Sequence, residues 1–170
     1  LLSKIADVAA AFLSAKIESG VNAVQIFDTW GGILSEDDFK EFSLTYIQKI
    51  ISQLRRNDEP VIVFAKGVHY MLDKLARCGA DVLGLDWTMN IGKARKRVGD
   101  KVALQGNLDP TVLYAGREKI EKEAGKILTL FGQGSGHIFN LGHGIFPDVP
   151  PENLKVLVDF VKKESAYFHR

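Results

Sequence analysis

The stretch 82-VLGLDWTMNIGKARKRVGDKVALQ-105 decides the fold, because it places two short apolar runs on either side of a helical segment. Val82–Leu85 and Val102–Gln105 have the length of buried strands, and Ile91–Val98 predicts a helix between them. The run of basic residues within that helix is typical of a solvated face. No hairpin turn separates the runs, so we expect two parallel strands joined by a right-handed crossover.

The same alternation extends toward the amino end. Apolar residues recur there at helical spacing up to Gly20, and the strand-like run Ala23–Phe27 follows. Ser35 can then cap a helix whose acidic first turn matches the positive end of the helix dipole. The apolar positions of the first helix are Ile5, Val8, Ala9, Phe12 and Ile17, and the expected buried stripe of the second is Phe39, Phe42, Tyr46, Ile50 and Leu54.

Five strand–helix units in all predict an α/β protein with a single domain over residues 1–170. The strands are apolar on both faces, as parallel strands covered by helices are. Two architectures fit the spacing: an open doubly wound sheet, and five-eighths of a (β/α)8 barrel whose first three units are missing. The remaining elements are strand Val61–Phe64, helix His69–Cys78, helix Arg117–Phe131, strand Ile138–Asn140, and a closing helix Glu152–Phe168 whose first turn suits Pro151.

Composition argues against several classes of protein. A net charge of +1 produces no positive electrostatic field strong enough to attract nucleic acid. The longest apolar run, Val8–Leu13, is far shorter than the roughly 20 residues that cross a bilayer, and the amino end has no signal-peptide pattern. The single cysteine, Cys78, excludes an internal disulfide and fits a reducing, cytoplasmic compartment. The chain begins in mid-pattern, so we expect a piece of a longer protein.

Polar residues gather where each strand ends, which is where both architectures carry their functional groups. His143 is the first candidate, because its flanking glycines let the backbone approach a ligand and leave the imidazole projecting from a loop. Thr29 offers a hydroxyl beside a Gly-Gly turn. The alternative roles are local: a turn cap for His143, and a hydrogen bond to nearby backbone for Thr29.

Carboxylates and a lysine at the strand ends have two interpretations. Asp28, Asp86 and Asp109 could act as acids or metal ligands, or they could fix their loops by accepting backbone N–H bonds. Lys66 could be a site residue or a solvated ammonium. No G-x-G-x-x-G follows a strand, and there is no Walker or G-x-S-x-G motif, so nucleotide cofactors and serine-hydrolase chemistry have no support.

Several long motifs together resemble those of the uroporphyrinogen decarboxylase family. They are Phe27–Gly32, Gly84–Thr88, Leu104–Pro110 with Leu113 and Tyr114, and Phe139–Ile145 with Asp148 and Pro150. The resemblance covers essentially the whole chain and implies a distorted (β/α)8 TIM barrel, of which this chain holds the five C-terminal units. It therefore favours the partial barrel over the open sheet. It also implies a homodimer whose active-site clefts face the interface.

The resemblance places substrate-binding roles on three residues. Thr29 matches the hydroxyl that binds a substrate carboxylate, His143 matches the cleft histidine that contacts carboxylate and positions the macrocycle, and Phe27 would supply an apolar wall. No catalytic residue is assigned in this half. The arginine-rich segment, the aspartate that binds the pyrrole N–H groups and the cleft tyrosine of the family are all expected before Leu1.

The implied reaction converts uroporphyrinogen III to coproporphyrinogen III by removing carbon dioxide from four acetate side chains, with no cofactor and no metal. Because the chain carries only part of the site, we expect the isolated chain to be inactive. Two alternatives remain. One is a cobalamin- or thiol-dependent methyltransferase of the same barrel, against which the lack of a cysteine near His143 argues. The other is a folded module that retains only packing or dimerisation.

Overall fold

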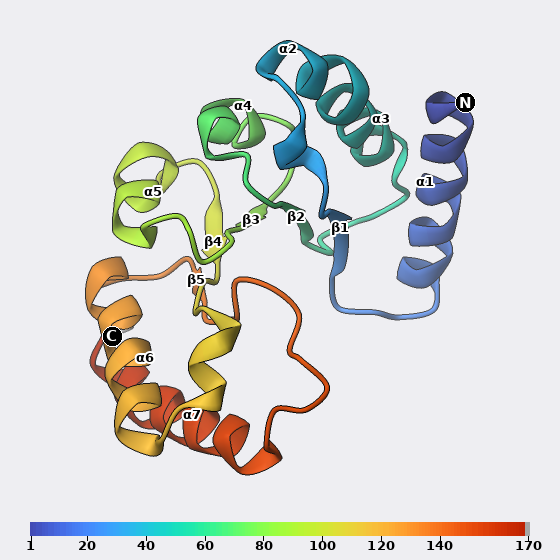
Figure 1. Ribbon diagram of the computed structural model, residues 1–170. Helices are drawn as coiled ribbons and strands as arrows, with labels where there is room; N and C mark the ends of the chain where they lie inside the picture. Colours follow the sequence, from blue (N-terminus) through green and yellow to red (C-terminus); the bar gives the residue numbers. More distant parts are fainter. Residues whose placement is uncertain (169–170) are drawn as a thin grey trace. The chain divides into compact units, whose positions relative to one another are not determined.

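The computed structural model describes residues 1–168, and its contacts divide the chain into two compact units (Figure 1). Unit 1 runs from Leu1 to Gly84, and unit 2 begins at Leu85. Each unit is built from short parallel strands that alternate with helices. This alternation confirms the predicted α/β class. The assignment of residues 1–170 to a single domain stays a prediction.

Unit 1 holds three parallel strands in the order β1-β2-β3. Phe27 of β1 lies opposite Phe64 of β2, and Phe64 lies opposite Gly84 of β3. All five residues of β2 are buried, as expected for a strand between two neighbours. The elements are α1 (Leu2–Glu18), β1 (Val24–Asp28), a 3-10 turn (Gly31–Ile33), α2 (Glu36–Phe39), a π-helical turn (Lys40–Leu44), α3 (Thr45–Gln53), β2 (Val61–Ala65), a 3-10 turn (His69–Met71), α4 (Leu72–Leu75) and β3 (Val82–Gly84).

Helix α1 is present where the sequence predicts it, but its larger apolar side chains do not form the buried face. The buried residues are Ala6, Ala10, Ser14 and Ile17, which pack on α3 and the start of the sheet. Ile5, Val8 and Phe12 lie on the opposite face, where Val8 is 70% exposed and Phe12 is 59% exposed. Small residues allow α1 and α3 to approach closely, and the exposed apolar face is left without cover in unit 1.

The helix after Ser35 begins as predicted, because the Ser35 hydroxyl accepts a hydrogen bond from the Asp38 amide (3.2 Å). Its buried stripe differs from the prediction at Phe42, which is 47% exposed. The π-helical turn at Lys40–Leu44 adds backbone to one turn and rotates the following residues. Ser43, Leu44 and Ile47 are buried there instead.

Unit 2 pairs β4 with β5 in parallel, and an isolated parallel bridge joins Leu108 to Leu141 just beyond them. Helices α5 and α6 have the predicted bounds: the Asn90 side chain caps α5, and Gly132 ends α6 with a φ of +82°. The closing α-helix is shorter than predicted and ends in a 3-10 turn. The elements are α5 (Ile91–Val98), β4 (Ala103–Gln105), a 3-10 helix (Pro110–Tyr114), α6 (Arg117–Phe131), β5 (His137–Ile138), α7 (Pro151–Glu164) and a 3-10 turn (Ser165–Tyr167).

Among the described residues, no helix combines the length and the apolar character that a membrane crossing requires.

Candidate functional site

Phe27 lies near the end of β1 in unit 1, and Thr29 is the first residue after the strand. Ile26, Phe27 and Asp28 all line a cavity together with residues of α3. Phe27 is 67% exposed, and its ring centroid lies 6.0 Å from that of Phe64. The carboxyl end of β1 therefore presents an exposed apolar ring, with a hydroxyl two residues further along the chain.

The Thr29 hydroxyl is half-buried and makes no hydrogen bond within residues 1–168. The local role considered for it, a bond to nearby backbone, is therefore not realised. The Gly-Gly turn that follows is needed for close backbone packing, since a Cβ at Gly32 would lie 2.6 Å from the Lys66 carbonyl oxygen and 2.9 Å from Gly67 Cα. This contact fixes the loop after β1 on the loop after β2, and it leaves the Thr29 hydroxyl available to a ligand.

Asp28 serves the fold of unit 1. Ser43 Oγ donates to Asp28 Oδ2 at 2.5 Å, and the Asp28 carbonyl accepts from the Lys66 amide at 3.1 Å. Ser43 lies within the π-helical turn, so this hydrogen bond ties the turn to the strand end. Sequence reasoning did not identify Ser43, because only apolar residues were assigned to the buried face of that helix.

His143 lies in the loop after β5, in unit 2, and this loop rests on the loop after β3. The half-buried imidazole meets the Trp87 ring edge-on, with centroids 6.0 Å apart and planes at 84°. Gly142 donates its N–H to the Leu108 carbonyl at 2.7 Å. A Cβ at Gly142 would lie 2.4 Å from the Trp87 nitrogen, so no other residue fits there. The glycine predicted to aid ligand approach is required here for packing.

Asp86 and Asp109 fix loops, which confirms the structural interpretation of both. Asp86 is buried, and its Oδ1 accepts from the Thr88 amide (2.9 Å) and the Thr88 hydroxyl (2.6 Å). Asp109 Oδ1 accepts in the same way from the amide and hydroxyl of Thr111, at 2.9 and 2.7 Å. Both are Asx turns at strand ends. The described residues contain no group of three His, Cys, Asp or Glu side chains that could hold a metal ion.

The far end of the His143 loop is anchored by Tyr114 and Asp148, two residues of the motifs quoted above. Tyr114 Oη donates to Asp148 Oδ1 at 2.5 Å, and the Tyr114 ring lies 6.0 Å from Phe146. The hydrogen bond to the carboxylate raises the pKa of the Tyr114 phenol above its ordinary value, with smaller contributions from burial and from the negative charge. The phenol therefore stays protonated as a donor, and the loop is held on both sides of His143.

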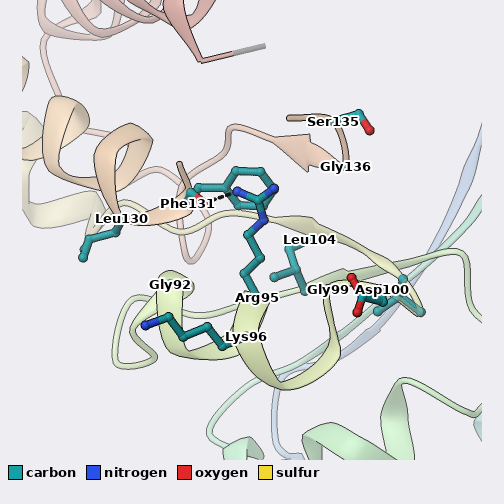
Figure 2. A pocket seen from close by; sticks show the side chains of 11 residues that line it. Gly92, Arg95, Lys96, Gly99, Asp100, Leu104, Leu130, Phe131, Ser135 and Gly136 are labelled. Atoms are coloured by element: carbon teal, nitrogen blue, oxygen red, sulfur yellow. Dashed lines mark hydrogen bonds between the residues drawn. The ribbon is translucent and has the colours of Figure 1, made fainter. Parts of the chain in front are cut away.

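A separate cavity of about 380 Å³ lies in unit 2, near the amino ends of β4 and β5 (Figure 2). Its principal side chain is Arg95, whose guanidinium lies 4.2 Å from the centroid of the Phe131 ring. Arg95 also donates to the carbonyl oxygens of Phe131 and Gln133, at the carboxyl end of α6. These contacts stabilise the fold, because the amino-end face of such barrels serves stability rather than chemistry.

Replacing Arg95 with alanine is expected to reduce the free energy of unfolding of the chain by about 2 kcal/mol. The substitution removes a cation–π contact and leaves carbonyls of the last turn of α6 without their charged donor. Urea unfolding followed by circular dichroism measures the change. Lys96→Ala, an exposed position on the same helix, is the matched control, with an expected change within about 0.5 kcal/mol. Equal effects at the two positions would contradict the role given to Arg95.

The chain is built from parallel strands that alternate with helices, and polar groups lie in the loops after the strands. These features define the α/β class with a partial barrel fold. The family model described as uroporphyrinogen decarboxylase (URO-D) matches residues 1–164. The chain belongs to this family.

Individual relatives agree with that assignment. The chain is 57% identical over 175 aligned residues to the uroporphyrinogen decarboxylase of Chloroherpeton thalassium, covering 100% of this chain and 50% of that protein. It is 55% identical over 177 aligned residues to the uroporphyrinogen decarboxylase of Neisseria gonorrhoeae, covering 99% of this chain and 50% of that protein. The chain thus spans about half the length of these curated relatives.

A solved structure supports the fold. A methyltransferase from Methanosarcina mazei matches with a TM-score of 0.81 and 25% identity, covering 93% of this chain and 47% of that chain. The partial barrel predicted from the resemblance is therefore confirmed, and the open doubly wound sheet is set aside. Thr29 with Phe27 lies in unit 1 and His143 in unit 2, so their meeting in one cleft stays a prediction.

Proposed function

We propose that the chain supplies part of the substrate site of a uroporphyrinogen decarboxylase, which converts uroporphyrinogen III to coproporphyrinogen III. The observation that carries the proposal is identity of 55% and 57%, over essentially the whole chain, to relatives that bear this name. The described structure supports it, because Phe27 lies at the end of β1, and Thr29 and His143 lie in loops that are held by specific contacts. The activity belongs to a protein of the relatives' length, of which this chain spans about half.

Thr29 and His143 are proposed to bind carboxylates of the substrate. The Thr29 hydroxyl is half-buried and makes no hydrogen bond within residues 1–168, so a carboxylate oxygen can accept its proton. The His143 imidazole can donate from a loop anchored on both sides. Phe27 offers an exposed ring at the end of the same strand, which suits contact with a flat macrocycle. These are binding roles, and no catalytic role is placed on this chain.

The proposed reaction proceeds in four steps at each acetate. Protonation of a ring carbon of the pyrrole that bears the acetate makes the ring an electron sink. The bond between the methylene and the carboxylate then breaks, carbon dioxide leaves, and the electron pair neutralises the ring as an enamine-like intermediate. Protonation of the methylene carbon gives the methyl group, and the ring carbon then loses the proton gained in the first step, which restores the neutral pyrrole. The net change consumes one proton and releases one carbon dioxide, so the chemistry needs no cofactor.

The proton donor, the carboxylate that holds the pyrrole N–H groups and most of the basic charge are proposed to come from the rest of the longer protein. An octa-anionic substrate needs strong neutralisation, and this chain has a net charge of only +1. Asp86 and Asp109 already hold their own loops, and Asp28 accepts from Ser43. All three carboxylates therefore stabilise the structure through hydrogen bonds, and none is proposed as the catalytic acid.

Methyltransferase chemistry is not favoured by the side chains of the chain. Such enzymes would use a cysteine thiolate near a histidine as a zinc ligand. Cys78 is buried in unit 1, and burial raises the pKa of its thiol. A thiol in this environment stays protonated at neutral pH and is a poor ligand.

The test of the proposed function is a product assay on the full-length protein that contains this chain. The protein is incubated with uroporphyrinogen III under reducing, anaerobic conditions, and the products are separated by chromatography. The proposal expects hepta-, hexa-, penta- and tetracarboxylate products to appear in turn without added metal or cofactor. Unchanged uroporphyrinogen, together with methyl transfer from a methylated donor to a thiol, would contradict it.

We also propose a cytoplasmic homodimer as the working form of the full-length enzyme. The single cysteine fits a reducing compartment, and the family resemblance implies the dimer. In the isolated chain two further surfaces are open: β1 is an edge strand of unit 1, and α1 exposes Ile5, Val8 and Phe12 on one side. Surfaces of this kind recruit partners.

The isolated chain is accordingly expected to self-associate at micromolar concentration. Val8→Glu combined with Phe12→Glu should shift the chain toward monomer, because two charges on the apolar face of α1 oppose its burial. Lys122→Glu, an exposed position on α6 that gives the same total change of charge, is the control and should leave the association unchanged. Light scattering measures the mass. A wild-type chain that stays monomeric would contradict the expectation.

A further inference from the structure

The loop that carries His143 has little to set the orientation of its own imidazole. Gly142 and Gly144 flank the residue, and no Cβ on either side restricts the backbone. Gly142 is held against the neighbouring loop, whereas a Cβ at Gly144 would meet nothing within 4 Å. The direction of the ring must therefore come from contacts that the ring itself makes.

Trp87 makes such a contact. Its indole meets the imidazole edge-on at 6.0 Å, and the arrangement at 84° is the favoured T-shaped geometry of aromatic pairs. Trp87 is itself half-buried. The two rings come from different loops, after β3 and after β5.

The backbone that carries Trp87 is fixed from both ends. The buried Asp86 carboxylate accepts from the amide and the hydroxyl of Thr88. Asn107, also buried, donates from Nδ2 to the carbonyls of Asp86 (2.8 Å) and Met89 (2.6 Å). Each end of the turn at 86–89 is thus tied to a group that solvent does not reach. A turn held in this way presents the indole as a rigid surface.

We propose that Trp87 is a positioning residue for His143: it sets the imidazole in the orientation that binds the substrate carboxylate. The inference rests on the proposed function, in which His143 contacts substrate. Trp87 acts through His143 and does not itself touch the reacting atoms. Asp86 and Asn107 hold the turn that carries Trp87. This role also explains why the Asp86 carboxylate is buried, although no catalytic role is proposed for it.

The test is a double-mutant cycle in the full-length enzyme with uroporphyrinogen III as the substrate. Trp87→Met keeps an adaptable apolar side chain and removes the ring. A contact of this type changes the population of one ring orientation by about two- to tenfold. The initial rate at low substrate, which reports kcat/KM, should therefore fall by about that factor. Trp87→Phe, which keeps an aromatic ring, should recover most of the loss.

The cycle separates positioning from general support of the fold. In a His143→Ala background, Trp87→Met should cause no further loss, because the group on which it acts is gone. If His143→Ala impairs the enzyme and Trp87→Met still causes its full loss in that background, the positioning role is overturned while the proposed function stands. If His143→Ala leaves the rate unchanged, both are overturned. Should Trp87→Met fail to fold by circular dichroism, Trp87→Leu takes its place in the same cycle.

Discussion

The isolated 170-residue chain is expected to show no measurable decarboxylation of uroporphyrinogen. General acid–base groups contribute about 10²–10⁴ in rate, and correct placement of the reactants contributes further large factors. Under the proposed function these groups lie in the rest of the longer protein. The rate of the isolated chain should thus be below about 10⁻⁴ of that of the full-length enzyme, measured by anaerobic incubation and chromatography of the carboxylate products.

Two controls make this result informative. Circular dichroism should show the helical signal of a folded chain, since helices in both units bury apolar residues. The full-length enzyme should be active in the same preparation of substrate. Turnover by the isolated chain at a rate near that of the full-length enzyme would contradict the account and would require a catalytic aspartate among Asp28, Asp86 and Asp109.

The second large effect concerns the two carboxylate-binding residues in the full-length enzyme. Thr29→Val removes the hydroxyl and keeps the shape of the side chain, and His143→Ala removes the imidazole. A hydrogen bond to a charged group is worth roughly 1.5–3 kcal/mol. Each substitution should therefore lower kcat/KM by about ten- to hundredfold, as measured from initial rates of product formation.

Thr29→Ser supplies the matched control for this prediction. It keeps the hydroxyl and loses only a methyl group, so its rate should stay close to that of the wild-type enzyme. A Thr29→Val variant as active as Thr29→Ser would show that the hydroxyl does not bind substrate.

Sequence reasoning succeeded where local chemistry determines the structure. The predicted bounds of α5 and α6 are confirmed, and the structure shows Asn90 capping the start of α5 and Gly132 ending α6. Asp86 and Asp109 have the loop-fixing role that was one of two considered for them, and each accepts from a threonine two residues on. These interactions join residues that are neighbours along the chain, so their spacing is sufficient to predict them.

Other features depend on contacts that spacing does not encode. At the π-helical turn Phe42 is exposed and the polar Ser43 is buried against Asp28, although the apolar pattern favoured Phe42 for the buried face. Helix α1 buries alanines against α3 rather than its larger apolar residues, because close approach of two helices favours small side chains. The contact between Trp87 and His143 joins two loops far apart in the sequence, and neither loop indicates the other.

The central claim is that Thr29 and His143 bind carboxylates of one substrate molecule in one cleft of the full-length enzyme. A crystal structure of that enzyme with coproporphyrinogen III, kept reduced, tests this most directly. The account predicts the Thr29 hydroxyl oxygen and an imidazole nitrogen of His143 each within about 3.2 Å of a carboxylate oxygen of the same bound molecule. A macrocycle bound with its carboxylates away from either residue, or Thr29 and His143 on separate surfaces, would contradict it.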